Sequence, residues 1–302
     1  MTSSNDARQW HIGLVGYGEV GRTLAEDLRA AGVIVSAFDR LLQAPSGEAL
    51  QRHAAAIGVR LASSHSDLVA GADLVVSAVT ADQTLAVAQA CRAGLRAGAF
   101  FLDFNSASPG TKIEAAGLVD GAGGRYVEGA VMTSIGPYRI RVPLLLGGPS
   151  AARLHPHLET LGFQAKVGSA ALGVVSATKM CRSILIKGLE AMVIECFSAA
   201  RAYGVEDAML ASLAETFPGI DWEQQGSYFF HRVIQHGRRR AEEMHEVART
   251  VSEVGLEPMS ASSTAERQAW VADLAARGLF GDGDAPLGDW RIEADRILNA
   301  TV

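Results

Sequence analysis

Short apolar runs alternate with helical periods over the first part of the chain. The runs HIGLVG, VIVSAFD, DLVVSAV and AFFLDF are each too short for a buried helix and too continuous for a strand with one face in water. Helical stretches near residues 21–31, 48–57 and 83–97 lie between them, and further strands are expected near RYVEGAV, RVPLLLGG and FQAKVG. This alternation is typical of βαβ units. It predicts an α/β domain at residues 1–168 with a doubly wound, mainly parallel sheet.

The pattern changes after about residue 170, where long helical periods replace the strand-like runs. Residues 172–203 are expected to form one long helix that links two domains. Further helical stretches lie near residues 207–215, 223–254 and 262–277. We therefore predict an all-α C-terminal domain at residues 169–302.

Composition narrows the possible partners. The chain has 302 residues, of which 48% are hydrophobic, enough for two cores. Its 27 Lys and Arg against 33 Asp and Glu give no overall basic field, so nucleic acid is not expected as a partner.

The apolar runs fall short of the ~20 residues of a membrane helix, and the N-terminus does not resemble a signal peptide. A cytoplasmic protein is expected, and Cys91, Cys181 and Cys196 are interpreted as buried thiols.

A glycine motif follows the first expected strand. Gly16, Gly18 and Gly21 form a G-x-G-x-x-G at the start of a helix. Gly16 would permit the tight turn, Gly18 would let the backbone approach a pyrophosphate, and Gly21 would let helix and strand pack closely. The unpaired N–H groups of the helix N-terminus would face the phosphates. The motif indicates a Rossmann domain that binds a nicotinamide dinucleotide.

Two residues after the second strand bear on the choice of cofactor. Asp39 stands 18 residues after the last glycine (39 − 21 = 18), where a carboxylate would bind the adenosine ribose hydroxyls and favour NAD. Arg40 could receive a 2′-phosphate, so NADP stays open. We expect NAD or NADP, with NAD preferred. The candidate cofactor-binding residues are Gly16, Tyr17, Gly18, Glu19, Val20, Gly21, Asp39, Arg40, Val79 and Thr80.

Four stretches in order resemble the β-hydroxyacid dehydrogenase family, which includes hydroxyisobutyrate and phosphogluconate dehydrogenases. They are GLVGYGEVGRTLAEDL, DFNSASPGT, YVEGAVMTSIGPYRIRVPLLLGG and GVVSATKMCRS. The resemblance covers the first two thirds of the chain well and the last third loosely. It implies that Asn105 and Ser106 lie beside the nicotinamide and the substrate, and that Lys179 stands at the place of the family's catalytic lysine.

This sequence departs from the family pattern at three places. Asp27 stands where an Asn is usual, and Met132-Thr133-Ser134 replaces a Ser-Gly-Gly in the substrate loop. The carboxylate contacts of that loop cannot be carried over unchanged, although the Thr133 and Ser134 hydroxyls could donate instead. Ser183 stands four residues after Lys179, where the family has an Asn. Its shorter side chain would leave more room or require a water.

Lys179 suits the chemistry of alcohol oxidation. A group must accept the hydroxyl proton as hydride departs, and a lysine desolvated by apolar neighbours can be neutral enough to do so. Ser183 lies four residues later, on the same face of the predicted helix, and could orient the lysine or the substrate. A surface lysine whose stem covers apolar side chains is the alternative reading.

The segment HRVIQHGRRRAEEMHE concentrates charge in the second domain. Spacings of three and four residues place His236, Arg239, Arg240 and Glu243 around one helix face, where Arg240 could reach a substrate carboxylate. A solvated, salt-bridged helix explains the same pattern. No metal site is expected, because His155 and His157 flank Pro156 in a segment interpreted as a loop and complete no ligand set.

These observations predict a dehydrogenase that oxidises a 3-hydroxy acid or a close analogue, with Lys179 as acid and base. The partner would be a small-molecule carboxylate, and the protein a homodimer. Decarboxylation could follow if the product is a β-keto acid. Two alternatives stay open: an imine or ketone reductase of the same architecture, and a cofactor-binding regulator that has lost catalysis.

Overall fold

The computed structural model describes residues 6–44, 47–281 and 288–301. Contacts divide the chain into two compact units, Met1–Met180 and Cys181–Val302. The division between the units falls inside a long helix, α7 (Val174–Tyr203). It lies 12 residues (180 − 168) after the domain boundary proposed from the sequence. The first turns of α7 belong to the first unit because they are hydrogen-bonded to its sheet, where Glu128 accepts from the Ser176 N–H.

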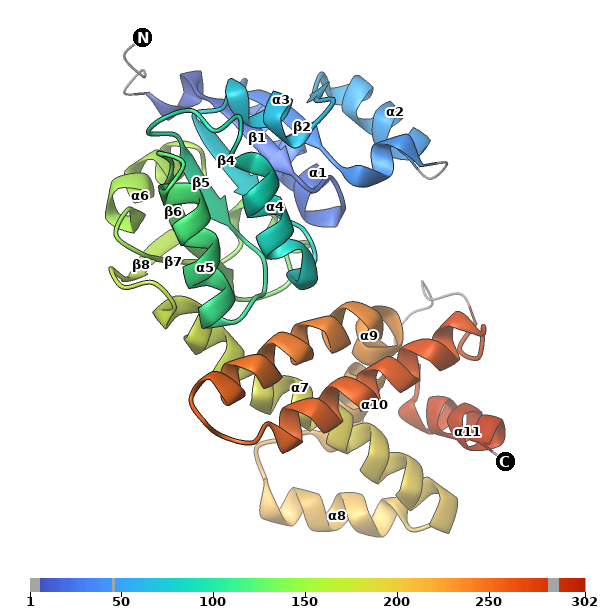
Figure 1. Cartoon of the computed structure of the whole chain (residues 1–302). Helices are drawn as coiled ribbons and strands as arrows, with labels where there is room; N and C mark the ends of the chain where they lie inside the picture. Colours follow the sequence, from blue (N-terminus) through green and yellow to red (C-terminus); the bar gives the residue numbers. More distant parts are fainter. Residues whose placement is uncertain (1–5, 45–46, 282–287, 302) are drawn as a thin grey trace. The chain divides into compact units, whose positions relative to one another are not determined.

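One sheet organises the first unit (Figure 1). Its strand order is β3-β2-β1-β4-β5-β6-β7-β8. All neighbours pair in parallel except β6 and β7, which are antiparallel. The doubly wound, mainly parallel sheet predicted from the sequence is therefore confirmed. The strands are β1 (His11–Val15), β2 (Ile34–Phe38), β3 (Arg60–Leu61), β4 (Leu74–Ser77), β5 (Phe100–Asp103), β6 (Arg125–Val131), β7 (Leu144–Gly147) and β8 (Ala165–Ser169).

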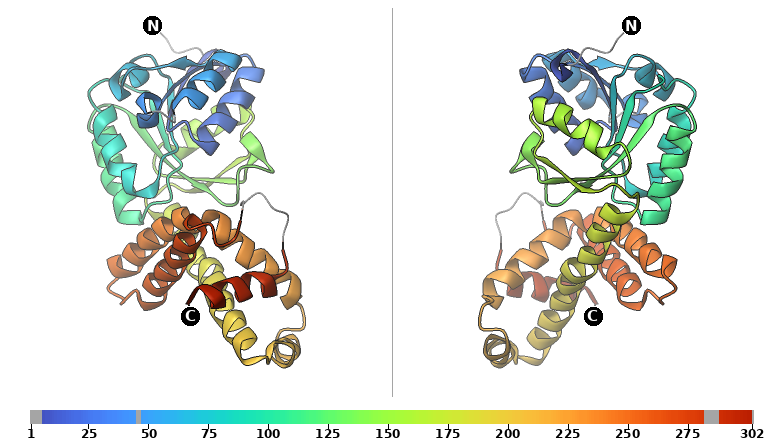
Figure 2. Two further views of the ribbon diagram at one scale, coloured as in Figure 1. Left: turned by 90° about the vertical axis from the view of Figure 1, so that its right-hand side faces the viewer. Right: turned by 90° about the vertical axis from the view of Figure 1, so that its left-hand side faces the viewer.

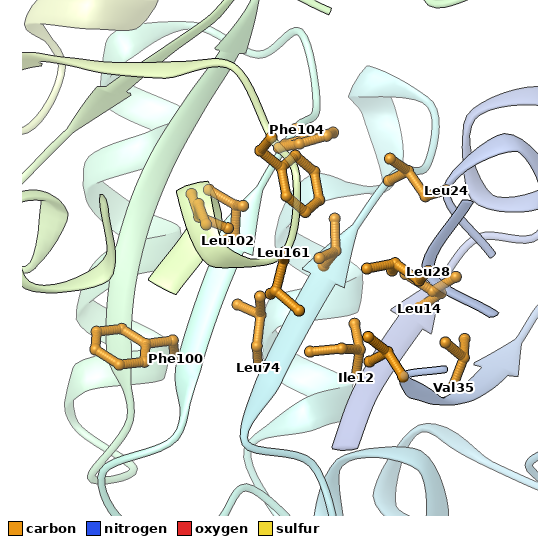
Figure 3. Packing of buried hydrophobic residues seen from close by; sticks show 14 of the residues in the cluster. Ile12, Leu14, Leu24, Leu28, Val35, Leu74, Phe100, Leu102, Phe104 and Leu161 are labelled. Carbon is orange, nitrogen blue, oxygen red and sulfur yellow. The ribbon is translucent and has the colours of Figure 1, made fainter. Parts of the chain in front are cut away.

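Helices cover both faces of this sheet because successive strand residues point to opposite sides. Leu14 and Val76 join one apolar cluster with α1 and α6 (Figure 3), whereas Val15 and Val75 join another with α3, α4 and α5. The helices are α1 (Glu19–Ala30), α2 (Gly47–Ile57), α3 (His65–Ala70), α4 (Thr84–Cys91), α5 (Pro109–Asp120) and α6 (Ala151–Thr160), with short 3-10 turns η1 (Ala7–Gln9), η2 (Arg40–Gln43), η3 (Ala81–Gln83) and η4 (Arg139–Arg141).

The described part of the second unit is helical, as predicted (Figure 2). Its core gathers Phe197 of α7, Phe230 of α9 and Trp290 of α11. The long helix expected at residues 172–203 is α7, and the stretches expected near 207–215, 223–254 and 262–277 correspond to α8, α9 and α10. α11 was not predicted. The helices after α7 are α8 (Glu206–Thr216), α9 (Trp222–Glu253), α10 (Met259–Ala276) and α11 (Trp290–Thr301).

Two local interpretations of the sequence were wrong. Cys91 is buried, and burial raises the pKa of its thiol to about 12, but Cys181 and Cys196 are exposed because they lie on outward positions of α7. The segment around Pro156 is helix α6 and not a loop. Pro156 lies inside it although proline usually ends a helix, and the His157 ring packs on Trp10 with 4.4 Å between centroids.

Among the described residues, no helix combines the length and the apolar character needed to cross a membrane.

Candidate active site

The glycine motif forms a tight turn between β1 and α1. Gly16 has φ +91°, and a Cβ there would collide with the Ala78 carbonyl of the neighbouring strand segment. A Cβ on Gly21 would collide with the Gly16 carbonyl. Gly18 differs, because a Cβ there would meet nothing within 4 Å. Gly16 and Gly21 are therefore required by the fold, whereas the space beside Gly18 is open for a ligand to approach the backbone.

The N-terminus of α1 presents its first turn beside this open space. Gly18 is the N-cap and makes no side-chain cap hydrogen bond, so the first N–H groups of the helix gain no partner from a capping side chain. Val20 packs against the core, and Glu19 is exposed. Their predicted contribution to cofactor binding would therefore come from backbone N–H groups.

Asp39 anchors the glycine loop to the end of β2. Its Oδ2 accepts from the Tyr17 N–H at 2.7 Å, and its Oδ1 accepts from the Leu41 N–H at 2.8 Å. Each carboxylate oxygen has a further lone pair, so these bonds leave capacity for ribose hydroxyls. Arg40 follows directly and is exposed.

Val79 and Thr80 follow β4 at the same edge of the sheet. The Val79 N–H donates to Asn105 Oδ1 at 2.8 Å, and the Thr80 hydroxyl donates to Asp82 at 2.5 Å. Hydrogen bonds from Thr80 and Gln83 lower the pKa of Asp82, and Arg40 adds a smaller electrostatic contribution. Arg40, after β2, therefore lies close enough to Asp82, after β4, to affect its carboxylate.

Asn105 joins the ends of β4 and β5. It is buried, its Nδ2 donates to Ser77 Oγ at 3.0 Å, and its Oδ1 accepts from Val79. Its own N–H donates to Asp103 at 2.9 Å. Ser108 then caps α5, where Pro109 occupies the first turn. The turn that carries Asn105 and Ser106 is therefore fixed on both sides. The side chain of Asn105 links the ends of β4 and β5 by hydrogen bonds.

Lys179 and Ser106 are in direct contact although 73 residues separate them. The Lys179 Nζ donates to Ser106 Oγ at 2.6 Å. Lys179 lies in the second turn of α7 and is half-buried, as is Ser106. An amine and a hydroxyl thus meet just beyond the carboxyl end of β5, where ligands bind in open parallel sheets. The structure therefore brings together the predicted catalytic lysine and one predicted substrate residue.

The Met132-Thr133-Ser134 segment begins directly after β6. The Met132 N–H donates to the Pro143 carbonyl at 3.0 Å, and Thr133 and Ser134 are exposed. Both hydroxyl-bearing residues lie at the carboxyl end of a strand, as the predicted role requires.

Asp27, one of the departures from the family pattern, links α1 to η4, which follows that segment along the chain. Its carboxylate accepts from the Arg139 guanidinium at 2.8 Å and from the Ile140 N–H at 3.0 Å. Arg139 also pairs with Glu26 at 2.6 Å, and its φ of +53° is uncommon for a residue other than glycine. The structure therefore explains the acidic residue at position 27, because its carboxylate binds the guanidinium of Arg139.

Two buried carboxylates beneath the site were not singled out from the sequence. Glu128 of β6 accepts the N–H groups of Gly173 at 3.0 Å and Ser176 at 2.7 Å. Asp103, its register partner on β5, accepts from Lys112 at 2.9 Å and Tyr126 at 2.6 Å. A charge inside an otherwise apolar strand, as in YVEG and FFLD, is the signal that would have revealed them.

The remaining two candidates lie in the second unit and have partners there. The Ser183 hydroxyl accepts from Lys187 Nζ at 3.1 Å. Arg240 is only 5% exposed and is paired with the buried Glu190. The solvated-face reading of α9 is therefore wrong at Arg240. Its proposed contact with a substrate carboxylate stays a prediction, one that would require a guanidinium already engaged in an ion pair. Within the described ranges, no group of three His, Cys, Asp or Glu residues could hold a metal ion.

Comparison with known proteins places the chain among cofactor-binding relatives. The sequence family described as the NAD binding domain of 6-phosphogluconate dehydrogenase matches residues 11–162, and a domain of unknown function (DUF1932) matches residues 200–271. A conserved hypothetical protein from Sinorhizobium meliloti 1021 is 34% identical, covers 95% of this chain and 97% of its own, and has a TM-score of 0.73. An uncharacterized 28.5 kDa protein of Methanothermus fervidus is 29% identical over 84% of this chain and 95% of its own length.

Solved enzymes share the same fold at lower identity. A 3-hydroxyisobutyrate dehydrogenase from Mycobacterium tuberculosis, solved with L-serine, is 19% identical with a TM-score of 0.66 and covers 96% of this chain and 99% of its own. An imine reductase from Myxococcus stipitatus, solved with NADP⁺, is 20% identical with a TM-score of 0.54 and covers 95% of this chain and 99% of its own. At these identities the likeness shows the fold alone.

Proposed function

The chain belongs to the family of the NAD binding domain of 6-phosphogluconate dehydrogenase, and on that premise we propose that it oxidises a 3-hydroxy acid or a close analogue with NAD or NADP. The contact between Lys179 Nζ and Ser106 Oγ at 2.6 Å carries this proposal. It supports the proposal because an amine, which can exchange a proton with a substrate, lies beside a hydroxyl at the edge of the sheet where the glycine loop ends. A regulator without chemistry would not require this pairing.

The residues of the glycine loop fit a dinucleotide. The open space at Gly18, the uncapped first turn of α1 and the carboxylate of Asp39 supply the three features that a pyrophosphate and a ribose require. A bound nicotinamide supplies the hydride acceptor. Asp39 favours NAD, and the exposed Arg40 leaves NADP open.

Lys179 is the proposed general base and acid. In the oxidation direction its neutral amine accepts the proton of the substrate hydroxyl as the carbon loses hydride, which leaves a carbonyl and an ammonium. In the reverse direction the ammonium returns that proton to the developing alkoxide. Ser106 Oγ orients the amine, since it already accepts a hydrogen bond from Nζ.

The substrate is proposed to be a small carboxylate. Thr133 and Ser134 are exposed at the carboxyl end of β6 and could donate hydroxyl hydrogen bonds to it, in place of the Ser-Gly-Gly that the family usually has. Contacts from Ser183 and Arg240, a following decarboxylation and a homodimer stay predictions.

The first test measures the rate of cofactor reduction with NAD and NADP separately. The panel contains 3-hydroxyisobutyrate, 3-hydroxypropionate, L-serine and, as an uncharged alcohol, 2-propanol. We expect turnover of carboxylates only, with kcat falling by roughly 10²-fold or more in Lys179→Ala. Lys166→Ala is the matched control, because Lys166 is an exposed lysine of β8.

Three other outcomes would contradict this function. Turnover of 2-propanol that survives Lys179→Ala would favour a ketone reductase, and reduction of a cyclic imine with NADPH would favour an imine reductase, whose fold the chain shares. Cofactor binding without turnover of any panel compound would favour the regulator.

A further inference from the structure

We propose that Glu128 is a positioning residue that sets Lys179 against Ser106. This inference rests on the proposed function, in which Lys179 is the acid and base. Glu128 does not touch the reacting atoms. It acts on the helix that carries Lys179.

Both oxygens of Glu128 bind the start of α7. Oε2 accepts from the Gly173 N–H at 3.0 Å and Oε1 from the Ser176 N–H at 2.7 Å. α7 begins at Val174, so these are N–H groups that the helix itself cannot satisfy. Lys179 follows Ser176 by three residues, which is less than one helical turn. Because the backbone of a helix is rigid over such a length, fixing Ser176 also fixes the backbone of Lys179. The carboxylate thereby fixes where the lysine side chain begins.

The surroundings of Glu128 provide hydrogen bonds and space for a buried carboxylate. The residue is 0% exposed, and an ionised group is buried at such a position only when hydrogen bonds and a favourable dipole compensate it. Gly147, its register partner on β7, leaves the necessary room, since a Cβ there would lie 2.6 Å from Glu128 Oε2. A glycine on β7 thus lets the carboxylate of β6 reach α7.

The adjacent strand fixes the other partner of the contact. Asp103 is the last residue of β5 and pairs in register with Glu128. It accepts the Asn105 N–H at 2.9 Å, and so holds the turn that ends at Ser106. Tyr126 donates to Asp103, and burial, followed by the charge of Asp103, raises the pKa of this phenol well above its usual value, which keeps it protonated. Two neighbouring carboxylates therefore fix Lys179 and Ser106 separately.

The first experiment needs no substrate. The chain has four lysines, Lys112, Lys166, Lys179 and Lys187, and reductive methylation with ¹³C-formaldehyde gives each accessible one an NMR signal that keeps its charge. The Lys179 signal is assigned by its absence in Lys179→Arg. We expect Glu128→Gln to move it toward the signal of exposed Lys166, because the amide nitrogen that replaces one carboxylate oxygen cannot accept from an N–H group. Glu114→Gln, at an exposed position of α5, is the matched control.

The second readout is a double-mutant cycle on kcat that combines Glu128→Gln with Lys179→Ala. The substrate is 3-hydroxyisobutyrate or whichever acid of the panel the wild-type protein oxidises. Glu128→Gln should lower kcat by roughly 10- to 100-fold, the effect of a small misplacement, while the cofactor Kd stays within about twofold. In the Lys179→Ala background the same change should alter kcat by less than about twofold, because the residue it positions is gone.

An unchanged Lys179 signal in Glu128→Gln would overturn the inference, and so would a full 10-fold loss repeated in the Lys179→Ala background. Wild-type turnover in Lys179→Ala would instead defeat the proposed function, and the NMR signal would then decide the inference by itself. Cofactor binding and thermal unfolding check that each variant folds. If Glu128→Gln does not fold, Glu128→Asp, which keeps the charge on a shorter side chain, takes its place with the same two expected outcomes.

Discussion

The two units of this chain bury charged side chains in different ways. In the first unit, Glu128 and Asp103 lie in the sheet and bind backbone N–H groups near the Lys179–Ser106 contact, and Asp103 is also paired with the buried Lys112. In the second unit, Arg240 pairs with Glu190, and Lys187 pairs with Glu243 at 2.9 Å. Gln268, also buried, donates to Glu190 at 3.2 Å and links α10 to this network.

The difference shows why a charged residue is not by itself a site. Buried charges that bind one another neutralise their field inside the fold and leave little for a ligand. A buried carboxylate that binds backbone N–H groups also fixes the position of a segment, as Glu128 does and as Asp103 does in addition to its pair with Lys112. Here those segments carry a half-buried amine and hydroxyl. The first unit therefore carries the stronger candidate site, and three substitutions test this contrast.

The largest effect on stability is expected from Arg240→Met. This substitution leaves Glu190 as a buried charge without its cation, and should lower the free energy of unfolding by about 3–5 kcal/mol. Urea denaturation followed by far-UV circular dichroism measures it. Cofactor affinity should not change, because the glycine loop belongs to the other unit.

Arg238→Met is the matched control on the same helix. Arg238 pairs with Asp273 at the surface, where both side chains are more than half exposed, so its loss should cost at most about 1 kcal/mol. Equal effects of the two substitutions would show that the Arg240 pair is no more important to the fold than a surface pair. The comparison between the units would then fail.

Gly18→Ala should separate binding from stability in the first unit. The new Cβ meets nothing within 4 Å in the protein but would occupy the space proposed for the pyrophosphate, so the Kd of NADH or NADPH should rise by about tenfold or more. Fluorescence titration measures the Kd, and thermal unfolding should be nearly unchanged. Gly117→Ala, equally open on α5, should alter neither quantity beyond a small gain in helix stability. Unchanged cofactor affinity in Gly18→Ala would place the pyrophosphate elsewhere.

The smallest effect is expected from Arg40→Ala, which sharpens the assignment of the cofactor. If the exposed guanidinium binds a 2′-phosphate, the ratio of the NADP Kd to the NAD Kd should rise by roughly threefold to tenfold. Arg52→Ala, at another exposed arginine, should leave that ratio unchanged. A constant ratio in Arg40→Ala would remove the 2′-phosphate contact and support NAD alone.

Several features followed from the sequence because their causes are local. The glycine spacing predicted the turn after β1, and its steric reasons at Gly16 and Gly21 are those the structure shows. The change from short apolar runs to helical periods predicted the sheet and the helical unit. Lys179 was identified through resemblance to a family, since its own neighbours along the chain also fit a surface lysine.

Other features could not be predicted because they depend on distant residues. The exposure of Cys181 and Cys196, the helix around Pro156 and the burial of Arg240 each reflect which face of an element packs on another. A periodic pattern indicates that a helix has an apolar face, but partners such as Glu190, 50 residues from Arg240, are chosen only when helices pack.

The sequence by itself determined the alternation of apolar strands with helices in the first unit, the change to long helices in the second, the glycine turn and the family of this protein. These depend on backbone sterics and on periodicities of a few residues, which any segment carries within itself. Only the tertiary structure decided that Lys179 meets Ser106 across 73 residues, and that Glu128 and Asp103 hold the two in place. Strand register and helix packing bring these groups together, because distant side chains acquire neighbours only when the sheet is complete.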